Sequence, residues 1–412
     1  MPKQLAIRGG GLSSLAPPRG AAVSVARGTI QSVGEKCVGM SSIAFSDSPA
    51  IRGGIRRLSP TASGAVTSIA HVIIPHGFGG AEKHVMELAE FQADDHQVVV
   101  ILGPGEDGGA GARHLAQSLD PRVSVVWLPS RMRTAALFWK LLALCPDIVH
   151  AHLNTAARRV LRCRPGCPRV VTLHNGFRAG LHERFDGIIR IADYQAGMMP
   201  AAAQDRSVTV HNWVLPQTGM LTRTEARAVL GLPLDAPVIG GMGRLELGKG
   251  FDVLVAAYAR LRAHRPDARL VLFGQGTEMD ALRQQVAQLA LGDHVVFAGF
   301  RPDVRRYLSA LDLGVVSSRH EPFGLTLLEY ADAGVTLVAT RTGGPLEILG
   351  ADYPFLCPPE DAPAMAETLL AALEGRVRAP RVDLARFRPE VQMAKVGALY
   401  AQLAGAQAPV AV

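Results

Sequence analysis

The sequence has few aromatic residues, few charged residues and no long apolar run. Aromatic residues make up 5% of the 412 residues and charged residues 19%, whereas hydrophobic residues make up 48%. Proteins that bind nucleic acids usually present a basic face and aromatic stacking platforms, so we expect no nucleic-acid partner. A membrane-spanning helix needs about 18 consecutive apolar residues, and no stretch approaches that length. The first residues also lack the apolar core of a secretory signal.

Cysteine is also scarce, and its spacing matches neither a disulfide framework nor a zinc site. An odd number of cysteines without a repeated two-residue spacing is typical of reduced thiols. Cys163 and Cys167 could bind a metal only if two further ligands converged on them. We therefore expect a cytoplasmic protein, at most peripheral at the inner face of a membrane, with no metal and no separate cofactor. The five cysteines are Cys37, Cys145, Cys163, Cys167 and Cys357.

The net charge of +7 is concentrated at the start of the chain. Residues 1–67 hold eight basic and two acidic residues, so the rest of the chain carries only +1. This segment is rich in Gly, Ser, Ala, Pro and Arg and has no hydrophobic period, which predicts a disordered tail. An organelle transit peptide would share this composition. A start codon placed too early would also explain it, with Met40 as a later start.

Apolar strand-like runs alternate with helical or loop segments from Ser68 onward. A first series extends to about residue 191, and a second begins with VIGGMGR and continues through ARLVLFG, HVVFAG, LDLGVVSS and VTLVAT. Such alternation predicts parallel, doubly wound sheets. We predict an α/β protein of two Rossmann-like domains that face each other across a cleft. Their expected ranges are 68–213 and 214–388, and the helix expected at 389–404 could pack on either domain.

Two cations follow the first strand of the second predicted domain. Arg244 comes directly after the strand, and Lys249 precedes the helix that begins near Phe251. Ligands of open α/β sheets bind at the carboxyl ends of strands, where helix N-termini offer free N–H groups to phosphate. Arg244 and Lys249 are therefore placed to hold a diphosphate and to neutralise it without a metal. Two solvated surface cations are the alternative.

The next strand ends in a glycine pair, Gly274 and Gly276. Glycine at such a turn lets a nucleotide approach the backbone, which makes both residues candidates for donor binding. Close packing between a helix and a strand requires glycine equally well.

Segment 317–329, with the sequence SSRHEPFGLTLLE, contains two glutamates eight residues apart. On one helix they would lie about 12 Å apart along the axis, too far for the paired carboxylates of a retaining glycosidase. We therefore expect a helix that starts near Pro322, with Glu321 in the preceding loop and Glu329 directed from the helix toward ribose hydroxyls. The backbone N–H groups expected to face the same ligand are those of Phe323, Gly324 and Leu325.

Candidate residues also occur in the first predicted domain. Gly79 and Gly80 form a strand-to-helix turn that should lie close to a ligand in the cleft. His174 ends the strand VVTLH and so points to the crevice side. His150 and His152 share one face at the end of another strand. Three nearby histidines suggest zinc, but their spacing supports no metal site.

Four motifs carry a resemblance to a known family. In this order, GMGRLELGKG, FGQGTE, HEPFGLTLLE and ATRTGGPLEIL resemble motifs of the retaining glycosyltransferases of family four, which have the GT-B fold. HGFGGAEKHV, DIVHAH and VVTLHNG agree more loosely, so the resemblance covers roughly residues 68–404. It implies transfer of a sugar from a nucleotide-diphosphate donor to a hydroxyl, with retention of configuration. The implied acceptors are glycans, lipid-linked sugars or lipopolysaccharide-type molecules.

The resemblance also implies roles for individual residues. Arg244 and Lys249 would hold the donor diphosphate. Glu321 would contact the sugar and Glu329 the ribose, while His174 would contact the donor sugar and stabilise the reacting centre. The loop with Gly79 and Gly80 would lie near the diphosphate and the acceptor.

The sequence departs from the family pattern at two places. Tyr330 and Asp332 occur where the family usually has Glu-Ala-Met-Ala, and Tyr330 is next to the expected ribose position, which leaves the nucleobase open. Thr336 replaces the proline of a Gly-x-Pro step, which should change only the stiffness of the turn.

Three alternatives stay open. A nucleotide-sugar epimerase on the same fold would keep the donor contacts without an acceptor, and a non-catalytic protein would bind a nucleotide sugar without turnover. The segment from Arg131 to Leu142 combines basic residues with Phe138 and Trp139, which suits docking to an anionic membrane. A buried helix edge explains that segment equally well.

Overall fold

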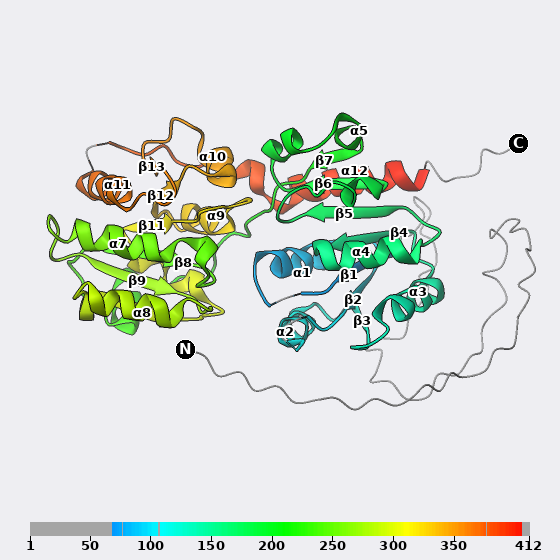
Figure 1. Ribbon diagram of the computed structural model, residues 1–412, viewed down its shortest axis with the longest axis horizontal. Helices are drawn as coiled ribbons and strands as arrows, with labels where there is room; N and C mark the ends of the chain where they lie inside the picture. The colour runs from blue at the N-terminus through cyan, green and yellow to red at the C-terminus, as the bar shows by residue number, and fades with distance from the viewer. Residues whose placement is uncertain (1–67, 76, 106–107, 376, 406–412) are drawn as a thin grey trace, which may run out of the picture. The chain divides into compact units, whose positions relative to one another are not determined.

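The computed structural model describes residues 68–75, 77–105, 108–375 and 377–405. All of them belong to one unit of the chain by their contacts. The predicted tail at 1–67, including Met40, lies outside the described residues. The described chain forms two parallel sheets, each accompanied by helices, which confirms the predicted α/β class (Figure 1).

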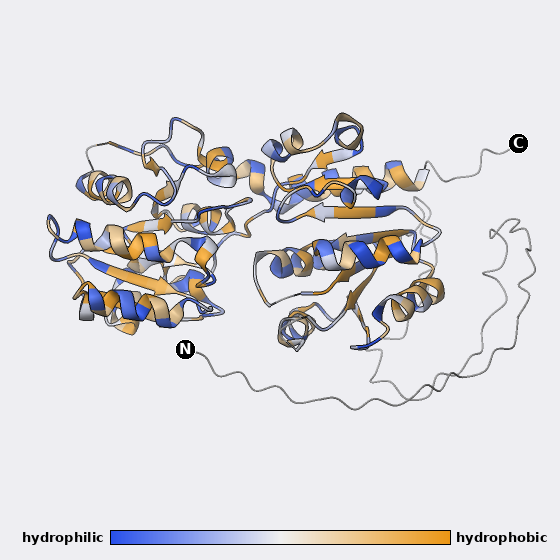
Figure 2. Ribbon diagram, in the orientation of Figure 1, coloured by the Kyte–Doolittle hydropathy of each residue, from blue (hydrophilic) through white to orange (hydrophobic). Residues whose placement is uncertain are grey.

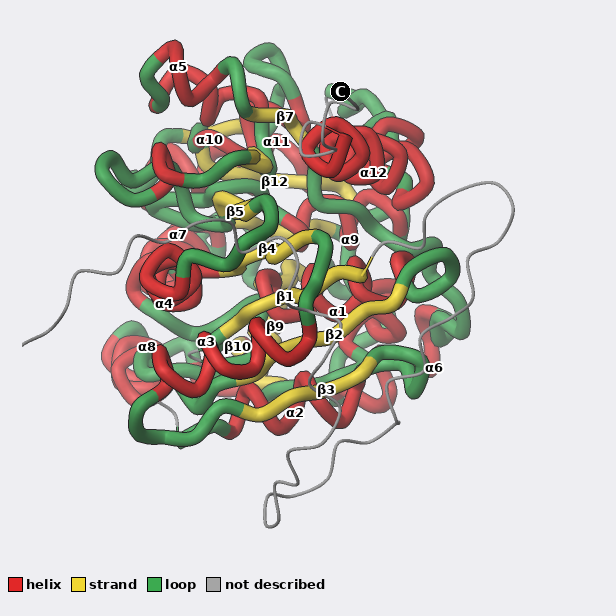
Figure 3. Tube along the Cα trace, turned by 90° about the vertical axis from the view of Figure 1, so that its right-hand side faces the viewer, coloured by secondary structure: helices red, strands yellow, loops and turns green. Residues whose placement is uncertain are grey.

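The first sheet has seven parallel strands in the order β3-β2-β1-β4-β5-β6-β7. Figure 3 shows β3, β2, β1, β4 and β5 side by side in this order. The strands are β1 (Ser68–Ile73), β2 (Gln97–Leu102), β3 (Ser124–Trp127), β4 (Ile148–His152), β5 (Arg169–Leu173), β6 (Gly187–Arg190) and β7 (Ser207–Thr209). The helices between them are α1 (Gly80–Gln92), α2 (Ala110–Ser118), α3 (Arg133–Leu144), α4 (Leu153–Cys163) and α5 (Ala201–Gln204), with short 3-10 turns η1 (His182–Arg184) and η2 (Asp193–Met198).

The second sheet has six parallel strands in the order β10-β9-β8-β11-β12-β13. They are β8 (Val238–Met242), β9 (Arg269–Phe273), β10 (Val295–Gly299), β11 (Leu313–Val316), β12 (Thr336–Thr340) and β13 (Leu356–Cys357). The helices in this later part of the sequence are α6 (Arg223–Leu230), α7 (Phe251–Leu261), α8 (Met279–Gln288), α9 (Leu325–Asp332), α10 (Gly343–Leu349), α11 (Ala362–Glu374) and α12 (Pro389–Gly405). The remaining 3-10 turns are η3 (Leu247–Lys249), η4 (Gly292–His294), η5 (Val304–Ala310) and η6 (Ala385–Phe387).

The apolar runs of the sequence become strands because parallel strands are covered by helices on both faces. Val238 and Ile239 of β8, and Leu270 and Leu272 of β9, are fully buried. Figure 2 shows the hydrophobic colour concentrated on the strands, whereas the helices carry both colours. Each helix therefore contributes one apolar stripe, and burying such a side chain stabilises the fold by roughly 1.5–3 kcal/mol.

The last helix, α12, packs against the first sheet although it follows the second sheet in the sequence. Val396 and Tyr400 lie in one apolar cluster with Ile69 and Ile148 of that sheet. A Cβ on Gly187 of β6 would lie 2.8 Å from Leu403 Cδ1, so α12 crosses the strand in close contact at this glycine. In Figure 1 this helix, in red, lies beside β7.

One element boundary was predicted wrongly. Helix α9 begins at Leu325 rather than near Pro322. The residue before it, Gly324, has a left-handed backbone with φ of 101°, which turns the chain into the helix only after the proline. Glu321 still lies in the preceding loop, as expected.

Candidate active site

The strand order places the predicted cations and the first glutamate at one edge of the second sheet. Its order reverses between β8 and β11, which are neighbours. In open α/β sheets, ligands bind outside the carboxyl ends of the strands at such a switch point. The loop after β8 carries Arg244 and Lys249, and the loop after β11 carries Glu321.

Lys249 and Glu321 form an ion pair at this edge. Lys249 Nζ lies 2.7 Å from Glu321 Oε2, and Ser318 Oγ donates to the same oxygen over 3.0 Å. The Glu321 side chain is 8% exposed, whereas the Lys249 side chain is 30% exposed. The ammonium group is therefore the member of the pair that an incoming anion can reach.

A close approach at a glycine and two hydrogen bonds hold the loop after β8 against the loop after β11. Gly250 has φ of 64°, and a Cβ there would lie 2.1 Å from the Ser317 carbonyl oxygen. Ser317 Oγ donates to the Lys249 carbonyl over 2.9 Å, and the Arg319 N–H donates to the Gly248 carbonyl over 2.9 Å. The sequence Lys249-Gly250 therefore sets the position of the lysine, because only glycine permits this approach.

Arg319 adds a charged clamp between the same loops. Its guanidinium donates to both carboxylate oxygens of Asp252 in α7, over 2.8 and 2.7 Å. Such bidentate pairs fix geometry more strongly than a single hydrogen bond does. Sequence reasoning assigned no role to either residue.

Gly274 and Gly276 allow the loop after β8 to pack on the loop after β9. A Cβ on Gly274 would lie 1.8 Å from the Gly243 carbonyl oxygen, and one on Gly276 would lie 2.3 Å from that of Leu245. Packing alone therefore requires both glycines. Their predicted contact with the donor stays a prediction.

The loop before α9 is fixed from the side of α10. The Gly344 N–H donates to the Glu321 carbonyl over 2.9 Å, and a Cβ on Gly344 would lie 2.0 Å from the Phe323 carbonyl oxygen. The Phe323 side chain is buried, with its ring 5.8 Å from that of Phe387. Leu325, the first residue of α9, is among the residues whose N–H groups have no partner within the helix.

Glu329 pairs with a lysine that sequence reasoning missed. Lys83 Nζ, on α1, lies 2.8 Å from Glu329 Oε1 on α9. Burial lowers the pKa of Lys83, but the carboxylates of Glu329 and Glu87 outweigh it and raise that pKa above its ordinary value. Burial also raises the pKa of Glu87 to about 7, against the effect of Lys83. The spacing of Lys83 and Glu87, one helical turn apart on α1, was a sequence signal that pointed to Lys83 itself but not to its pairing with Glu329.

The glycine turn at the start of α1 lies close to the start of α9 and to the loop after β8. A Cβ on Gly80 would lie 3.1 Å from Leu325 Cδ1, and one on Gly79 would lie 3.7 Å from Arg244 Nε. Arg244 itself pairs with the exposed Glu246 over 2.6 Å. The structure thus brings the predicted turn and the predicted cation together.

The Tyr330 side chain faces the second sheet and not the side of α9 that carries Glu329. It is fully buried, and its hydroxyl donates to the Gly240 carbonyl over 3.2 Å. A Cβ on Gly314 of β11 would lie 2.5 Å from its ring. Because Tyr330 follows Glu329 by one position on the helix, its side chain points to the sheet while Glu329 points away from it. Tyr330 therefore leaves the nucleobase question untouched.

His174 is the end of a chain of hydrogen bonds that runs through the first sheet. Its Nε2 lies 3.1 Å from His152 Nδ1, and His152 Nε2 lies 3.0 Å from His71 Nδ1. His71 Nε2 lies 2.7 Å from Gln92 Oε1 of α1. Burial lowers the pKa of His174 and of His71 to about 4. These imidazoles are therefore neutral near pH 7.

The histidines considered for zinc, His150, His152 and His174, all have hydrogen-bonded ring nitrogens. The structure adds His71 to this group, since His71, His150 and His152 have ring nitrogens within 4.8 Å of one another. His150 bonds Tyr400 and Thr172 over 2.6 and 2.7 Å. Since both ring nitrogens of His71, His150 and His152 already have a partner, a metal would have to break this network.

Two family models match the chain, one over each half. The model of the group 1 glycosyl transferases matches residues 222–386, and the model of glycosyltransferase family 4 matches residues 78–216. The glycogen synthase of Mycobacterium tuberculosis is 33% identical over 367 residues, which cover 74% of this chain and 85% of that protein. The chain belongs to the group 1 glycosyltransferases. This glycosyltransferase therefore transfers a sugar from a nucleotide-sugar donor.

Two further comparisons agree with this family. The lipopolysaccharide core biosynthesis glycosyltransferase LpsE of Rhizobium meliloti is 44% identical over 119 residues, but the match spans only 34% of that relative and 29% of this chain. The crystal structure of Anabaena HepE in complex with UDP and glucose superimposes with a TM-score of 0.65 and 22% identity, over 82% of this chain and 95% of that one. The likeness confirms the predicted GT-B fold of two Rossmann-like domains.

Proposed function

We propose that this glycosyltransferase binds a nucleoside-diphosphate sugar at the edge formed by the β8 and β11 loops and transfers the sugar with retention of configuration. The observation that carries the proposal is the Lys249–Glu321 pair at the switch point, with Arg244 and Gly79 in contact range of each other. We assign the donor to residues 214–388. The acceptor is assigned to residues 68–213, together with the helix at 389–404.

In the proposed reaction, the bond between the sugar C1 and the diphosphate oxygen breaks and its electron pair stays on the diphosphate. The acceptor oxygen bonds to C1 on the same face, and its proton passes to a diphosphate oxygen. Lys249 and Arg244 stabilise the leaving charge, which is the largest catalytic contribution in many enzymes. Glu321 contacts the sugar, and Glu329 accepts from ribose hydroxyls. No metal or separate cofactor takes part.

Donor binding requires Glu329 to share its carboxylate. One oxygen of Glu329 accepts from Lys83, and a carboxylate has about four acceptor positions in all. Ribose hydroxyls can therefore bind beside Lys83 without removing it. In the proposed complex, Lys83 neutralises Glu329 and holds it at the donor.

The experiment is a donor screen on the purified chain. Release of a nucleoside diphosphate is measured for UDP, GDP and ADP sugars, with and without glycan acceptors. We expect release that depends on the acceptor, and a product whose anomeric configuration matches the donor by NMR. An isomerised donor without transfer would indicate an epimerase, and donor binding without release would indicate a non-catalytic protein. A product with inverted anomeric configuration would refute the proposed retention but not the proposed transfer.

We further propose that the acceptor is an anionic glycolipid or lipopolysaccharide-type glycan, met at the inner face of a membrane. No helix among the described residues is long and apolar enough to cross a membrane, so contact would be peripheral. The lipopolysaccharide relative supports this class of acceptor. The surface of α3 and α4 supports the contact, because residues 131–164 hold seven basic residues and one acidic residue.

Apolar side chains stand out on this basic surface. Trp139 is 65% exposed, and its neighbour Phe138 and the residue directly before α3, Met132, are exposed as well. Aromatic residues flanked by basic ones are typical of helices that lie at a membrane interface. The predicted alternative of a buried helix edge fails for these residues, because the side chains that face the sheet are Leu137 and Leu141 instead.

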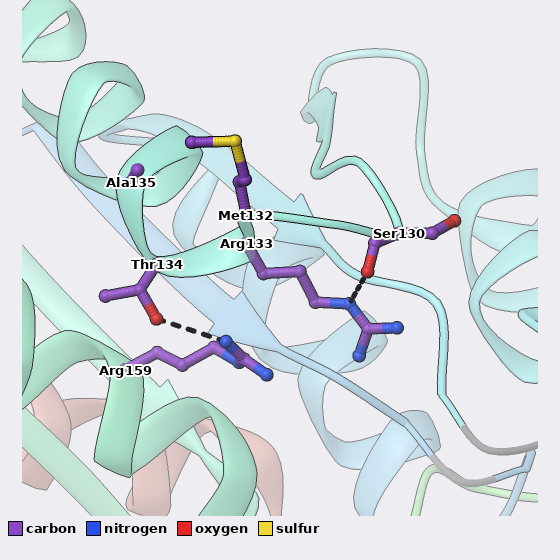
Figure 4. A pocket seen from close by; sticks show the side chains of 6 residues that line it. All are labelled: Ser130, Met132, Arg133, Thr134, Ala135 and Arg159. Atoms are coloured by element: carbon purple, nitrogen blue, oxygen red, sulfur yellow. Dashed lines mark hydrogen bonds between the residues drawn. The ribbon is translucent and has the colours of Figure 1, made fainter. Parts of the chain in front are cut away.

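An open depression of about 320 Å³ lies at the start of α3, and we propose that its arginines bind the phosphate of an anionic lipid. Arg159 donates to Thr134 Oγ1 over 3.1 Å, and Arg133 donates to the Ser130 carbonyl over 3.1 Å. Figure 4 shows these two arginines, one from α4 and one from α3, among the residues that line the depression. Both guanidinium groups keep further N–H donors for a phosphate.

Vesicle sedimentation tests the membrane contact. We expect the chain to sediment with vesicles of phosphatidylglycerol at low salt and not with vesicles of phosphatidylcholine alone. The double variant Arg133→Ala, Arg159→Ala should lose most of this binding. The matched control, Arg378→Ala with Arg381→Ala, removes two exposed cations from the other half of the chain and should retain it. Equal loss in both variants would indicate a general charge effect and contradict the assignment.

A further inference from the structure

A chain of hydrogen bonds runs from Gln92 at the end of α1, through the buried His71 and His152, to His174. The hydrogen bonds join Gln92 to His71 over 2.7 Å, His71 to His152 over 3.0 Å, and His152 to His174 over 3.1 Å. The four groups come from four different elements, namely α1, β1, β4 and the end of β5. We call this set the histidine relay. The family resemblance implies a role only for its last member, His174.

A neutral imidazole has one N–H group and one lone pair, so the relay has a direction. If one ring donates through Nε2, it must accept through Nδ1, and the next ring must donate to it. The direction of every bond is therefore fixed by the group at the end of the relay. That group is Gln92, whose amide oxygen only accepts.

The Gln92 amide presents its oxygen to the relay, because Oε1 lies 2.7 Å from His71 Nε2. An amide oxygen can only accept, so the hydrogen on this contact belongs to His71. His71 must donate through Nε2, His152 must donate through Nε2, and His174 must donate through Nε2.

We propose that the histidine relay fixes His174 as a neutral hydrogen-bond acceptor, with the proton on Nε2 and the lone pair on Nδ1 available to a hydroxyl of the donor sugar. The part about the sugar rests on the proposed function. Gln92, His71 and His152 are then positioning residues, and His174 cannot serve as a proton donor to the leaving group. A donor sugar that lacks the matching hydroxyl would leave the buried acceptor unpaired, which costs binding.

The relay explains why these polar groups are buried in an apolar sheet. Each buried imidazole without a partner would cost about 1–3 kcal/mol, and the pairwise bonds remove that cost. His150 offers an internal comparison, because it lies on the same strand as His152 and is equally buried but bonds Tyr400 and Thr172 instead. It does not lead to His174.

The proton positions can be measured by NMR on protein labelled with ¹⁵N-histidine, since the two ring nitrogens give different long-range couplings and shifts in each tautomer. We expect His174 of the free enzyme to carry its proton on Nε2 alone. Gln92→Leu removes the terminal acceptor and should give mixed tautomers at His174, whereas Gln92→Glu keeps an acceptor and should preserve the single tautomer. His150→Gln is the matched control and should also preserve it. An Nδ1 proton on His174 in the wild-type enzyme overturns the relay whatever the activity.

Turnover tests the second part of the proposal. A series of monodeoxy donor sugars should contain one member whose kcat/KM falls about tenfold in the wild-type enzyme, and this penalty should disappear in His152→Phe, which fills the same space without nitrogen. His150→Gln should keep the penalty. If the penalty persists in His152→Phe, the relay does not control the sugar contact. If no donor turns over at all, the proposed function fails while the tautomer still decides whether the relay exists.

Discussion

At the scale of single residues, the Lys249–Glu321 pair combines structural and functional roles. The buried carboxylate has Lys249 and Ser318 as its side-chain partners. Breaking a buried ion pair by removing one member leaves an uncompensated charge and commonly costs more than the intact pair contributes. The same lysine is the accessible cation at the switch point. Its removal should therefore affect both stability and donor turnover, and the two effects must be measured separately.

We predict that Lys249→Ala lowers kcat/KM for the donor by about 10²-fold or more, because one preorganised contact to the leaving charge is lost. Kinetics with a saturating acceptor measure the turnover, and circular dichroism checks that the variant is folded at the assay temperature. Lys395→Ala on α12 is the control, because it removes a lysine far along the sequence that has no assigned contact. Unchanged kcat/KM in folded Lys249→Ala would remove the proposed role of this lysine.

At the scale of elements, glycines decide whether the loops after β8, β9 and β11 can meet. Gly250 combines φ of 64° with a Cβ position 2.1 Å from a backbone oxygen. A side chain there must distort either the turn into α7 or the loop after β11. The neighbouring Gly248 has open space at the Cβ position, and its backbone is outside the left-handed region.

We therefore predict that Gly250→Ala lowers the free energy of unfolding by about 2 kcal/mol or more, since strained left-handed positions alone cost about 1–3 kcal/mol each. It should also weaken donor binding by displacing Lys249. Gly248→Ala, two positions away in the same loop, should change the free energy of unfolding by less than about 0.5 kcal/mol. Urea denaturation of the two variants measures both values. Similar stabilities of the two variants would contradict this account of the loop.

The elements themselves were largely predictable, because buried parallel strands leave continuous apolar runs in the sequence. Lys249 and Glu321 were also predictable, since both follow strand ends and both belong to motifs. The Lys83–Glu329 pair was not, because its members are 246 positions apart and belong to helices whose meeting depends on the tertiary structure. The position of α12 on the first sheet was left open for the same reason. The start of α9 was predicted wrongly because proline signals a helix start more visibly than a left-handed glycine does.

The histidine relay shows a further limit. His150, His152 and His174 were visible as strand ends, and metal binding was the alternative considered for them. His71 and Gln92 attracted no notice, since a lone histidine in a strand and a glutamine at a helix end are common. Only the side-by-side arrangement of β1, β4 and β5 places their side chains within hydrogen-bond distance. A pattern of period two along one strand carries no information about the next strand.

At the scale of the whole molecule, buried histidines should make the fold sensitive to acid. Burial lowers the pKa of His71, His174 and His182 to about 4 and places those of His84, His150 and His152 well below 6.5. In the unfolded chain these groups titrate at about 6.5. Between pH 6.5 and 4 the unfolded state therefore binds more protons than the folded state, and the free energy of unfolding falls as the pH falls.

Glu87 acts in the opposite direction. Its pKa is raised from 4.5 to about 7 by burial, so the folded state binds more protons between these values and stability decreases as the pH rises from 4.5 to 7. A shift of this size corresponds to roughly 3 kcal/mol for one group. Each of the three histidines with a pKa near 4 has a shift of similar size, so their combined effect exceeds that of the single glutamate. The free energy of unfolding should therefore fall as the pH falls, as the histidines alone would predict.

We predict that the urea midpoint is highest near or above pH 7 and falls steeply between pH 6.5 and 5. Denaturation curves at half-unit steps measure the slope, which should exceed one proton per molecule. Glu87→Gln removes the opposing titration, so the variant should gain stability relative to the wild type at pH 8 and lose that advantage by pH 4.5. A flat midpoint from pH 7 to 5 in the wild type would mean that the buried histidines take up protons without unfolding, and it would contradict this prediction.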